Sequence, residues 1–395
     1  MTFFVIIFCL LVFILLIFLD FKMGRYNHIR HARTIIPPET KGNYRLFKNG
    51  SPLFEQLFQD ISDASVQVDV YFFLVEKDYI TGNFLNVLKN KAREGVPVRF
   101  MVDRLGGHKV TKEMRKELED AGVDFQFAEK PGFPYFFYRL NRRNHRKVTV
   151  VDGKYAYVGG FNIGKNYMGE SSTFGNWRDY HIRLTGPIVE DLHRVFLDDW
   201  YLATGIEEQP LPSTSEGRHR IQMIATDGVG LEEEFVRMIQ SAEKEVLIGS
   251  PYFIPTKTLM DSFLRVLKKG IHVKILIPMK SDHPFVKEAA LPYLKSLHEH
   301  GATIRFFDAG FYHSKMIIID ESFADIGTAN FDRRSLFLNK EVNTYIYEKG
   351  FIRDLRETYL EDFNDGYPFD EHWWKIRSVG TKIREKIAVL LRPFL

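Results

Sequence analysis

Two histidines, each followed two residues later by a lysine, are the strongest candidates for chemistry in this sequence. The first motif, HRKVTVVD, begins at His145, and the second, HSKMIIID, begins at His313. The apolar residues after each lysine predict a strand that begins at the histidine, and side chains two residues apart on a strand point to the same side. We therefore expect each lysine, Lys147 or Lys315, to lie beside the histidine of its own motif. An imidazole with a neighbouring cation is suited to an anionic substrate.

Both motifs belong to a longer internal repeat. Each half reads strand, helix, strand, from Ser65 in SVQVDVYFFL and from Glu245 in EVLIGSPYFI. A period this long indicates a duplicated domain rather than a solenoid. The same separation of 168 residues relates four pairs of residues, which are His145 and His313, Lys147 and Lys315, Asp152 and Asp320, and Asn162 and Asn330.

These patterns predict an α/β fold with two related domains. Apolar, β-branched runs that alternate with helical periods imply parallel strands with crossover helices that cover both faces of the sheet. Residues 205–218 are rich in Pro, Ser, Glu and Gly, as is typical of a surface linker. We therefore expect domains at residues 44–204 and 219–381, followed by a tail at residues 382–395.

The composition excludes several classes of protein. Hydrophobic residues make up 45% and charged residues 27% of the chain, so bulk disorder is excluded. The net charge of +3 gives no basis for a nucleic-acid coat. The single cysteine, Cys9, excludes an intramolecular disulfide and a Cys-based zinc cluster.

An apolar run from Phe3 to Leu19 opens the chain. As a helix it reaches roughly 25 Å, slightly less than a bilayer core of about 30 Å. We expect a single-pass transmembrane anchor at residues 1–21 and a basic juxtamembrane segment at residues 22–43. A cleaved signal peptide is the alternative, but no Lys or Arg precedes the run and no small-residue cleavage site follows it. The positive-inside rule places the following domains on the cytoplasmic side, because four cations follow the run, namely Lys22, Arg25, Arg30 and Arg33.

With both motifs complete, the sequence resembles the phospholipase D superfamily, in which two HxKxxxxD motifs meet at a pseudo-twofold interface. The resemblance covers the chain from about Tyr44 onward and implies two pseudo-twofold-related phospholipase D-like α/β domains. Four further segments resemble the bacterial cardiolipin synthase branch of that superfamily, and they are RRNHRK at Arg142, GPIVEDLHRVFLDDW at Gly186, SPYFIP at Ser250 and GTANFDRRS at Gly327.

The resemblance implies a covalent two-step transfer. One neutral imidazole attacks a phosphodiester phosphorus, the first alcohol leaves, and a second alcohol or water attacks the phosphohistidine. The other imidazole acts first as acid and then as base, which suits a reference pKa of about 6.5. Lys147 and Lys315, with the amides of Asn162 and Asn330, would stabilise charge on the phosphate oxygens. By analogy with the family we expect His145 to be the nucleophile.

Each histidine also needs a partner that fixes its tautomer. In the superfamily this partner is an acidic residue some thirty positions downstream, and the candidates are Asp179 in NWRDYHIRL and Glu341 in NKEVNTYIY. A solvated strand edge is the alternative for both. Asp152 and Asp320 complete the candidate set, and we interpret them as structural residues near the site because they lie five residues after the lysines.

The segment before the first motif, FPYFFYRLNRRNHRK, combines aromatic residues with arginines. Aromatic rings of this kind lie at headgroup depth and arginine binds phosphate through a bidentate fork, so the segment predicts a lipid entrance with Arg142 and Arg143 as substrate ligands. A buried aromatic cluster is the alternative. Arg333 and Arg334 follow the second motif and are expected to face anionic lipid. The tail from Lys382 predicts an interfacial amphipathic helix, which could equally pack on the domain.

The leading hypothesis is a bacterial cell-membrane phosphatidyltransferase that condenses two phosphatidylglycerols into cardiolipin and glycerol. The choice of phosphatidylglycerol as substrate rests on the resemblance, whereas the residues alone indicate phosphodiester chemistry at an anionic lipid. The expected partners are phosphatidylglycerol, other anionic phospholipids and the membrane, and the chemistry requires no nucleic acid, metal or cofactor. The alternatives are a phospholipase D-type hydrolase, a phosphatidyl transferase with another acceptor, a membrane-tethered nuclease and a catalytically dead scaffold.

Overall fold

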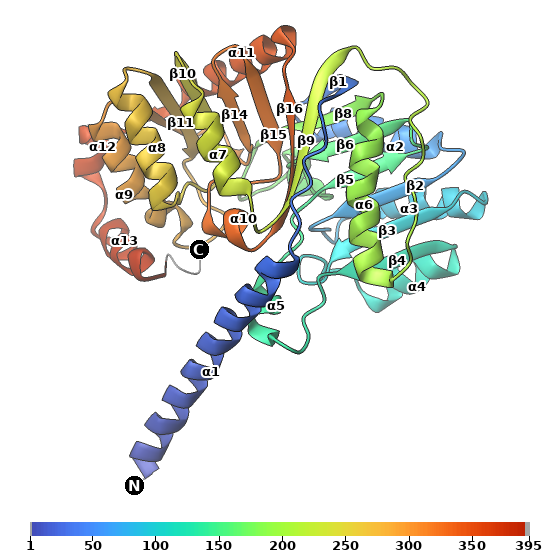
Figure 1. The fold of residues 1–395 in the computed structure, drawn as a ribbon, viewed down its shortest axis with the longest axis horizontal. Coiled ribbons are helices and arrows are strands. Elements are labelled where there is room, and N and C mark those ends of the chain that lie inside the picture. Colours follow the sequence, from blue (N-terminus) through green and yellow to red (C-terminus); the bar gives the residue numbers. More distant parts are fainter. Residues whose placement is uncertain (1, 392–395) are drawn as a thin grey trace.

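The computed structural model describes residues 2–391, which form one long mixed sheet with helices on both faces (Figure 1). The helices are α1 (Thr2–His31), α2 (Gly50–Ser62), α3 (Tyr79–Arg93), α4 (Lys112–Asp120), α5 (Phe136–Asn141), α6 (Ile188–Thr204), α7 (Leu231–Gln240), α8 (Lys257–Lys268), α9 (Val286–Glu299), α10 (Arg333–Phe337), α11 (Lys349–Asp365), α12 (Glu371–Ile376) and α13 (Val379–Leu391). The strands are β1 (Thr40–Phe47), β2 (Val68–Phe72), β3 (Val98–Asp103), β4 (Val123–Ala128), β5 (Val148–Val151), β6 (Tyr155–Gly159), β7 (Trp177–Arg178), β8 (His181–Thr185), β9 (His219–Asp227), β10 (Glu245–Gly249), β11 (His272–Pro278), β12 (Thr303–Phe307), β13 (Phe311–Tyr312), β14 (Met316–Ile319), β15 (Phe323–Gly327), β16 (Lys340–Ile346) and β17 (Tyr367–Pro368).

The sheet repeats one strand order twice about its centre. From one edge the order is β4-β3-β2-β5-β6-β8-β1, and from the other, inside β17, it is β12-β11-β10-β14-β15-β16-β9. The outer three strands of each half are parallel, and β1 pairs with β9 in antiparallel orientation at the centre. Antiparallel pairing of equivalent strands is what a pseudo-twofold axis requires. The predicted pair of related α/β domains is therefore confirmed.

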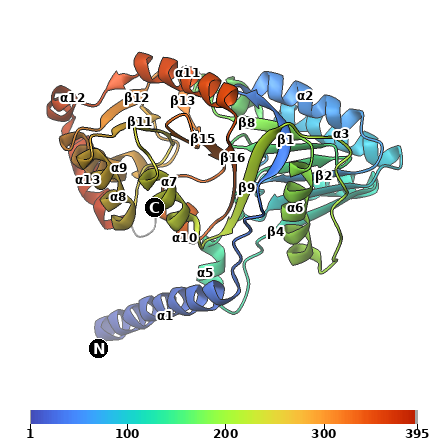
Figure 2. The ribbon, with the colours of Figure 1, turned by 45° about the horizontal axis from the view of Figure 1, so that its top comes forward.

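Three large hydrophobic cores hold this arrangement together, and a fourth, small cluster lies under α13. Helices α2 and α3 cover one face of the first half, and α7, α8 and α9 cover one face of the second. The third core lies under α6 and α11, and its buried side chains come from both halves of the sheet (Figure 2). Trp200 on α6 and Tyr359 on α11 are fully buried there. Because neither half can bury this core alone, the two halves form one body.

The two motifs lie on equivalent hairpins, β5 with β6 and β14 with β15. The strands begin at Val148 and Met316, three residues after the positions we expected. Each histidine is held instead by a backbone hydrogen bond across the molecular centre. The His145 amide donates to the Lys340 carbonyl at 2.9 Å, and the His313 amide donates to the Arg178 carbonyl at 2.8 Å.

Asp152 and Asp320 end the strands β5 and β14 in the left-handed region, with φ of 56° and 52°. The Asp152 carboxylate accepts hydrogen bonds from three successive amides, residues 65–67, at 2.8 to 2.9 Å. Asp320 accepts equivalent bonds from the amides of residues 243–245 at 2.7 to 2.9 Å. Seven Cα-to-Cα steps separate each aspartate from its histidine, which corresponds to roughly 20 Å of extended chain at about 3.3 Å per step. Both residues are structural, but they do not lie near the histidines as we expected.

Helix α1 projects from the body and its apolar residues are exposed (Figure 1). Among the described residues it is the one helix long and apolar enough to cross a membrane. The helix does not end near residue 21 but continues to His31, because its last turns pack on α5. Asp20 accepts a 2.8 Å hydrogen bond from the Tyr138 amide, and Gly24 leaves no room for a larger side chain against the Tyr138 ring.

The expected linker and tail are both visible. Residues 205–218 contain no helix or strand and join α6 to β9. Helix α13 packs on α9, where Ala388 is fully buried and Arg384 contacts Glu288 at 2.9 Å. Its other side leaves Ile383 and Ile387 exposed. Packing on the domain, the alternative that the sequence left open, is therefore what α13 does, and residues 392–395 of the expected tail lie outside the described residues.

We expect Asp320→Ala to lower the free energy of unfolding by about 2 kcal/mol, because three amides lose a charged acceptor. Asp320→Asn keeps one acceptor oxygen and a residue type that tolerates the left-handed region, so it should cost less. Urea unfolding followed by circular dichroism measures both changes. A variant that unfolds like the parent chain but has lost its activity would contradict the structural role.

Candidate active site

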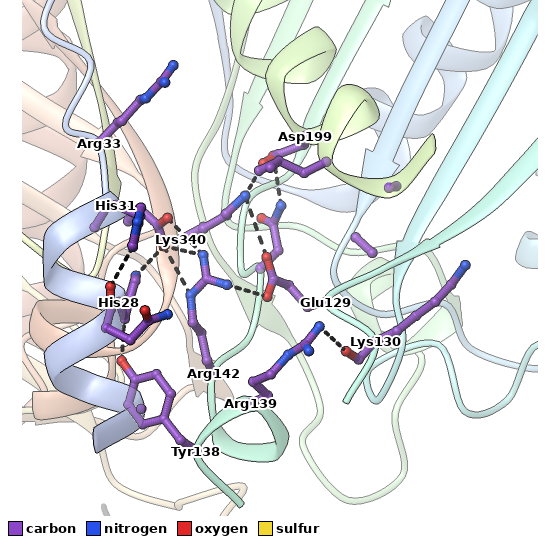
Figure 3. Close-up of a pocket in the computed structure, with 18 of the residues that line it drawn as sticks. His28, His31, Arg33, Glu129, Lys130, Tyr138, Arg139, Arg142, Asp199 and Lys340 are labelled. Carbon is purple, nitrogen blue, oxygen red and sulfur yellow. Dashed lines mark hydrogen bonds and ion pairs between the residues drawn. The ribbon is translucent and has the colours of Figure 1, made fainter. Parts of the chain in front are cut away.

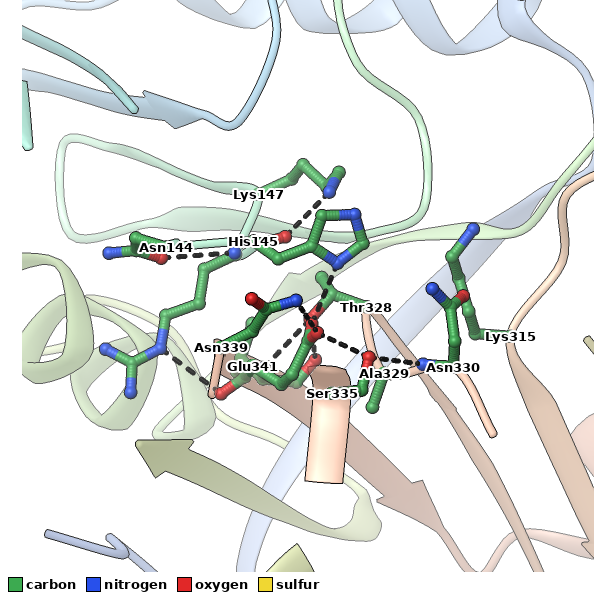
Figure 4. A network of polar contacts seen from close by, with 12 residues as sticks. Asn144, His145, Lys147, Lys315, Thr328, Ala329, Asn330, Ser335, Asn339 and Glu341 are labelled. Carbon is green, nitrogen blue, oxygen red and sulfur yellow. Dashed lines mark hydrogen bonds and ion pairs between the residues drawn. The ribbon is translucent and has the colours of Figure 1, made fainter. Parts of the chain in front are cut away.

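The two motifs meet at the centre of the sheet, where side chains from both halves form one polar site. Figure 4 shows His145 and Lys147 of the first half together with Lys315 and Asn330 of the second. The charges of Lys147 and Lys315 lower each imidazole's pKa, and the presence of His145 also lowers that of His313. The sequence expectation of one composite site matches this geometry.

The acidic partners are crossed between the halves. The Nδ1 atom of His145 lies 3.0 Å from an oxygen of Glu341, and Nδ1 of His313 lies 2.6 Å from an oxygen of Asp179. The structure brings Asp179 and Glu341 to the histidines, but each contacts the histidine of the other half and not, as we expected, the one upstream in its own half. The segments after β7 and at the start of β16 cross the centre of the sheet, so each half supplies the carboxylate of the other.

Glu341 is held by several donors besides His145 (Figure 4). Thr328 donates to one carboxylate oxygen at 2.5 Å, and Ser335 donates to the other at 2.7 Å. Burial by itself raises the pKa of Glu341, but the interactions with His145 and Thr328 outweigh it and lower this pKa below its ordinary value. Glu341 is therefore a fixed carboxylate.

Asp179 is held less firmly than Glu341. Besides His313, the Tyr180 amide is its donor, at 2.8 Å. Burial raises the pKa of Asp179 to about 6, although the charge of Lys315 opposes this. Asp179 is therefore protonated more readily than Glu341.

Burial favours the neutral form of both imidazoles. Burial lowers the pKa of His145 below 6.5, while Glu341 raises it in part. Burial and the charge of Lys315 lower the pKa of His313 further. A neutral imidazole that faces a carboxylate through Nδ1 carries its proton there. The Nε2 lone pair of His145 is then available for reaction, whereas Nε2 of His313 lies 3.0 Å from the Lys315 ammonium.

Two buried lysines make the site suited to an anion. Lys147 donates to the His145 carbonyl at 2.6 Å, and Lys315 lies 2.7 and 3.0 Å from the two ring nitrogens of His313. Burial lowers the pKa of Lys147 to about 7 and that of Lys315 to about 8. The nearest carboxylate to either ammonium, that of Asp179, is 3.8 Å from Lys315. A bound phosphate would restore the charge that burial disfavours.

The two asparagines differ in their contacts. Asn162 accepts from the Leu74 amide and donates to the Tyr167 hydroxyl, each at 3.1 Å. Asn330 donates to Asp332 at 3.2 Å, and its side-chain oxygen is buried without a partner among the described residues. Both amides are almost fully buried, and their expected role at the phosphate oxygens stays a prediction.

Arg142 and Arg143 are committed to carboxylates of the protein. Arg142 makes a two-pronged contact with Asp227, with nitrogen-to-oxygen distances of 2.6 and 2.8 Å, and a further one with Glu129 at 2.7 Å. Arg143 is buried and contacts Asp103 at 3.1 Å. These contacts do not support their expected role as substrate ligands, because most of their donors are already occupied by protein groups. The exception is Nε of Arg143, which is buried without a partner among the described residues.

Arg333 and Arg334 lie on α10 beside the second motif. Arg334 donates to the Asn141 carbonyl at 2.6 Å and thereby joins the halves. The Arg333 side chain is exposed, with its guanidinium 5.5 Å from the centre of the Phe337 ring. Of the four predicted arginine ligands, Arg333 is therefore the one whose guanidinium is open to solvent.

Sequence reasoning missed the groups that support the histidines. Thr328 and Ser335, which hold Glu341, both lie in the GTANFDRRS segment that carried the resemblance, so a signal for them was present. The rings of Trp177 and Phe311 lie 5.0 and 5.8 Å from the His313 ring. These two aromatics meet because β7 of one half pairs with β13 of the other, which no local pattern encodes.

Comparisons with known proteins agree with this geometry. The profile of the family described as "Cardiolipin synthase, PLD-like domain" matches residues 57–200 and 235–363. The minor cardiolipin synthase ClsB of Bacillus subtilis (strain 168) is 40% identical over 363 residues, which span 91% of this chain and 91% of that protein. A cardiolipin synthase of Staphylococcus aureus (strain N315) is 34% identical over 366 residues, which span 90% of this chain and 74% of that protein.

A solved structure supports the fold. The crystal structure of phosphatidylserine synthase from Haemophilus influenzae Rd KW20 has a TM-score of 0.68 at 15% sequence identity. The alignment covers 94% of this chain and 99% of that one.

We expect Glu341→Gln to lower the pKa of His145, because the carboxylate is the group that raises it. Side-chain nitrogen NMR of histidine-labelled protein measures this pKa, and in the parent chain it should lie below 6.5. The matched control is Glu357→Gln on the exposed side of α11, which should leave the titration unchanged. An unchanged or raised pKa in Glu341→Gln would argue against the crossed pairing.

Proposed function

The chain belongs to the cardiolipin synthase family of phospholipase D-like enzymes, and we propose that it joins two phosphatidylglycerols into cardiolipin and glycerol. The observation that carries the proposal is the arrangement of two neutral imidazoles and two buried ammonium groups around one centre. The names of the relatives in Bacillus subtilis and Staphylococcus aureus support the choice of substrate.

The first half-reaction forms a covalent intermediate. Nε2 of His145 attacks the phosphorus of one phosphatidylglycerol, and the bond from phosphorus to the headgroup glycerol oxygen breaks. His313, protonated once the phosphate offsets the nearby lysine charges, gives its proton to the leaving glycerol. The firm hold on Glu341 favours His145 as nucleophile, because a fixed carboxylate stabilises the positive charge that develops on the ring.

The second half-reaction transfers the phosphatidyl group. Neutral His313 takes the proton of a primary hydroxyl on the glycerol of a second phosphatidylglycerol, and that oxygen attacks the phosphorus. The bond between phosphorus and His145 breaks, which releases cardiolipin and restores both imidazoles. In each step Lys147 and Lys315 stabilise the charge on the non-bridging oxygens.

The surface around α1 supports a position at the cytoplasmic face of a membrane. Figures 1 and 2 show α5 and α13 on the side of the body from which α1 projects. Phe133, before α5, is 85% exposed, and the exposed apolar side chains of α13 include Ile383. Apolar groups beside cations are suited to the headgroup boundary of a bilayer. Together with α1, these elements would keep the active site next to a lipid substrate.

We expect the purified enzyme in detergent to convert phosphatidylglycerol into equal amounts of cardiolipin and free glycerol. His145→Ala and His313→Ala should each lower the rate by at least about 1,000-fold, because a nucleophile or an acid and base is lost. The control is His300→Ala, which changes an exposed histidine directly after α9 and should retain the parent rate. Parallel incubations with phosphatidylethanolamine and single-stranded DNA test the other acceptors and the nuclease. Phosphatidic acid without cardiolipin would indicate a hydrolase and contradict the proposal.

We expect a bell-shaped dependence of kcat/KM on pH, since this ratio reports groups of the free enzyme. Activity should fall in acid below pH 6.5, because the nucleophilic imidazole, whose pKa is lowered, gains a proton there. Activity should also decrease as the pH rises above the range from about 7 to about 8, because the two lysines lose their charge there. The pKa of Lys147 is about 7 and that of Lys315 is about 8. A profile that stays flat from neutral to strongly basic pH would show that the charge of the lysines is not required.

A further inference from the structure

A cavity of about 880 Å³ lies outside the catalytic centre, between the end of α1, the α5 segment and the end of α6 (Figure 3). Neither His145 nor His313 lines it. Its volume falls within the range of about 300 to 1,000 Å³ that is typical of small-molecule sites. The reaction described above makes no use of it.

The cavity and the catalytic site share one wall. Asn144 and Arg146 line the cavity, and both donate to Asp199, at 2.7 and 2.9 Å. His145, between them on an extended segment, points the other way toward Glu341, as alternating side chains do. The cavity therefore lies behind the catalytic wall and not within the active site.

The second strand of this wall repeats the pattern. Lys340 lines the cavity and contacts Asp199 at 2.8 Å, whereas the next residue, Glu341, faces the imidazole. The amide of His145 bonds to the Lys340 carbonyl. The cavity wall therefore contains the sequence neighbours of both members of one catalytic pair, and these neighbours are themselves almost fully buried.

The inner charges of the cavity are already paired. Asp227 binds His28 and Arg142, and Glu129 binds Arg142 and Lys340. These contacts join α1 to the body and leave little net charge at the floor of the cavity (Figure 3).

The cations at the opening are not paired. Arg33, after α1, and Lys130, after β4, line the cavity from opposite sides, and neither makes an ion pair within residues 2–391 (Figure 3). Arg139 donates to the carbonyls of Lys130 and Phe133 and has no carboxylate partner among the described residues. Asp198 also lines the cavity and makes no ion pair among the described residues, so one carboxylate stands against these three cations and the cavity keeps an excess of positive charge.

We propose that this cavity binds the phosphate-bearing headgroup of an anionic phospholipid, as a second lipid site distinct from the catalytic one. The occupant comes from the membrane because α1, with its exposed apolar surface, forms one wall of the opening. Basic pockets beside transmembrane helices on the cytoplasmic side recognise anionic headgroups. The inference rests on α1 crossing the membrane and not on the reaction proposed above.

Native mass spectrometry of the full chain in detergent tests this site by counting retained lipids. Every sample carries His145→Ala, so that the phosphatidylglycerol probe is not consumed. We expect the double variant Arg33→Glu with Lys130→Glu to retain one phosphatidylglycerol fewer than its parent. The matched control, Lys112→Glu with Lys116→Glu, reverses two exposed cations on α4 and should retain the parent count. Thermal unfolding confirms that each variant is folded, and the milder pair Arg33→Gln with Lys130→Gln should reduce lipid retention in the same direction.

Two further arms identify the ligand. Phosphatidylcholine, which has no net charge, should be retained equally by parent and double variant. Millimolar inorganic phosphate should not displace phosphatidylglycerol from the parent chain. Equal phosphatidylglycerol counts in parent and double variant would overturn the site. Displacement by inorganic phosphate would assign the cavity to free phosphate and overturn the lipid identity. Because no turnover is measured, these outcomes are independent of the proposed reaction.

Discussion

The crossed contacts between histidines and carboxylates are the constraint on which the rest of the structure depends. His145 needs Glu341 from the second half, and His313 needs Asp179 from the first. Neither half alone can supply an imidazole together with its carboxylate, so the two halves of the sheet must join in a fixed register. The pairing of β1 with β9 and the shared core under α6 and α11 provide that register. The contacts that stabilise the interface between the halves therefore also set the geometry of the site.

The site is electrostatically incomplete without an anion. Two ammonium groups and two imidazoles are buried together, and burial lowers the pKa of all four. A phosphodiester bound between them would offset the lysine charges and let one imidazole hold a proton. Glu341 has more hydrogen-bond donors than Asp179, so the two histidines of the repeat have different surroundings. A duplicated domain can therefore give its two histidines different tasks.

Much of the fold and the centre of the site could be predicted from the sequence, because both depend on local patterns. Apolar alternation indicated the strands, and the gap-free repeat indicated two equivalent domains. The crossing of the carboxylates could not be predicted, because periodicity does not identify which distant strand lies opposite His145. Arg142 was interpreted as a substrate ligand for the same reason, since its partner Asp227 lies 85 residues away in the chain. The continuation of α1 to His31 depends on contacts with α5 that exist only in the folded protein.

The central claim is that His145, paired with Glu341, carries the covalent intermediate. The most direct test is rapid quenching of the enzyme with labelled phosphatidylglycerol, followed by peptide mapping of the phosphatidyl group. The account predicts label on the peptide that contains His145 in the parent chain and none in His145→Ala. Label that persists in His145→Ala, or that maps to the peptide of His313, would contradict it.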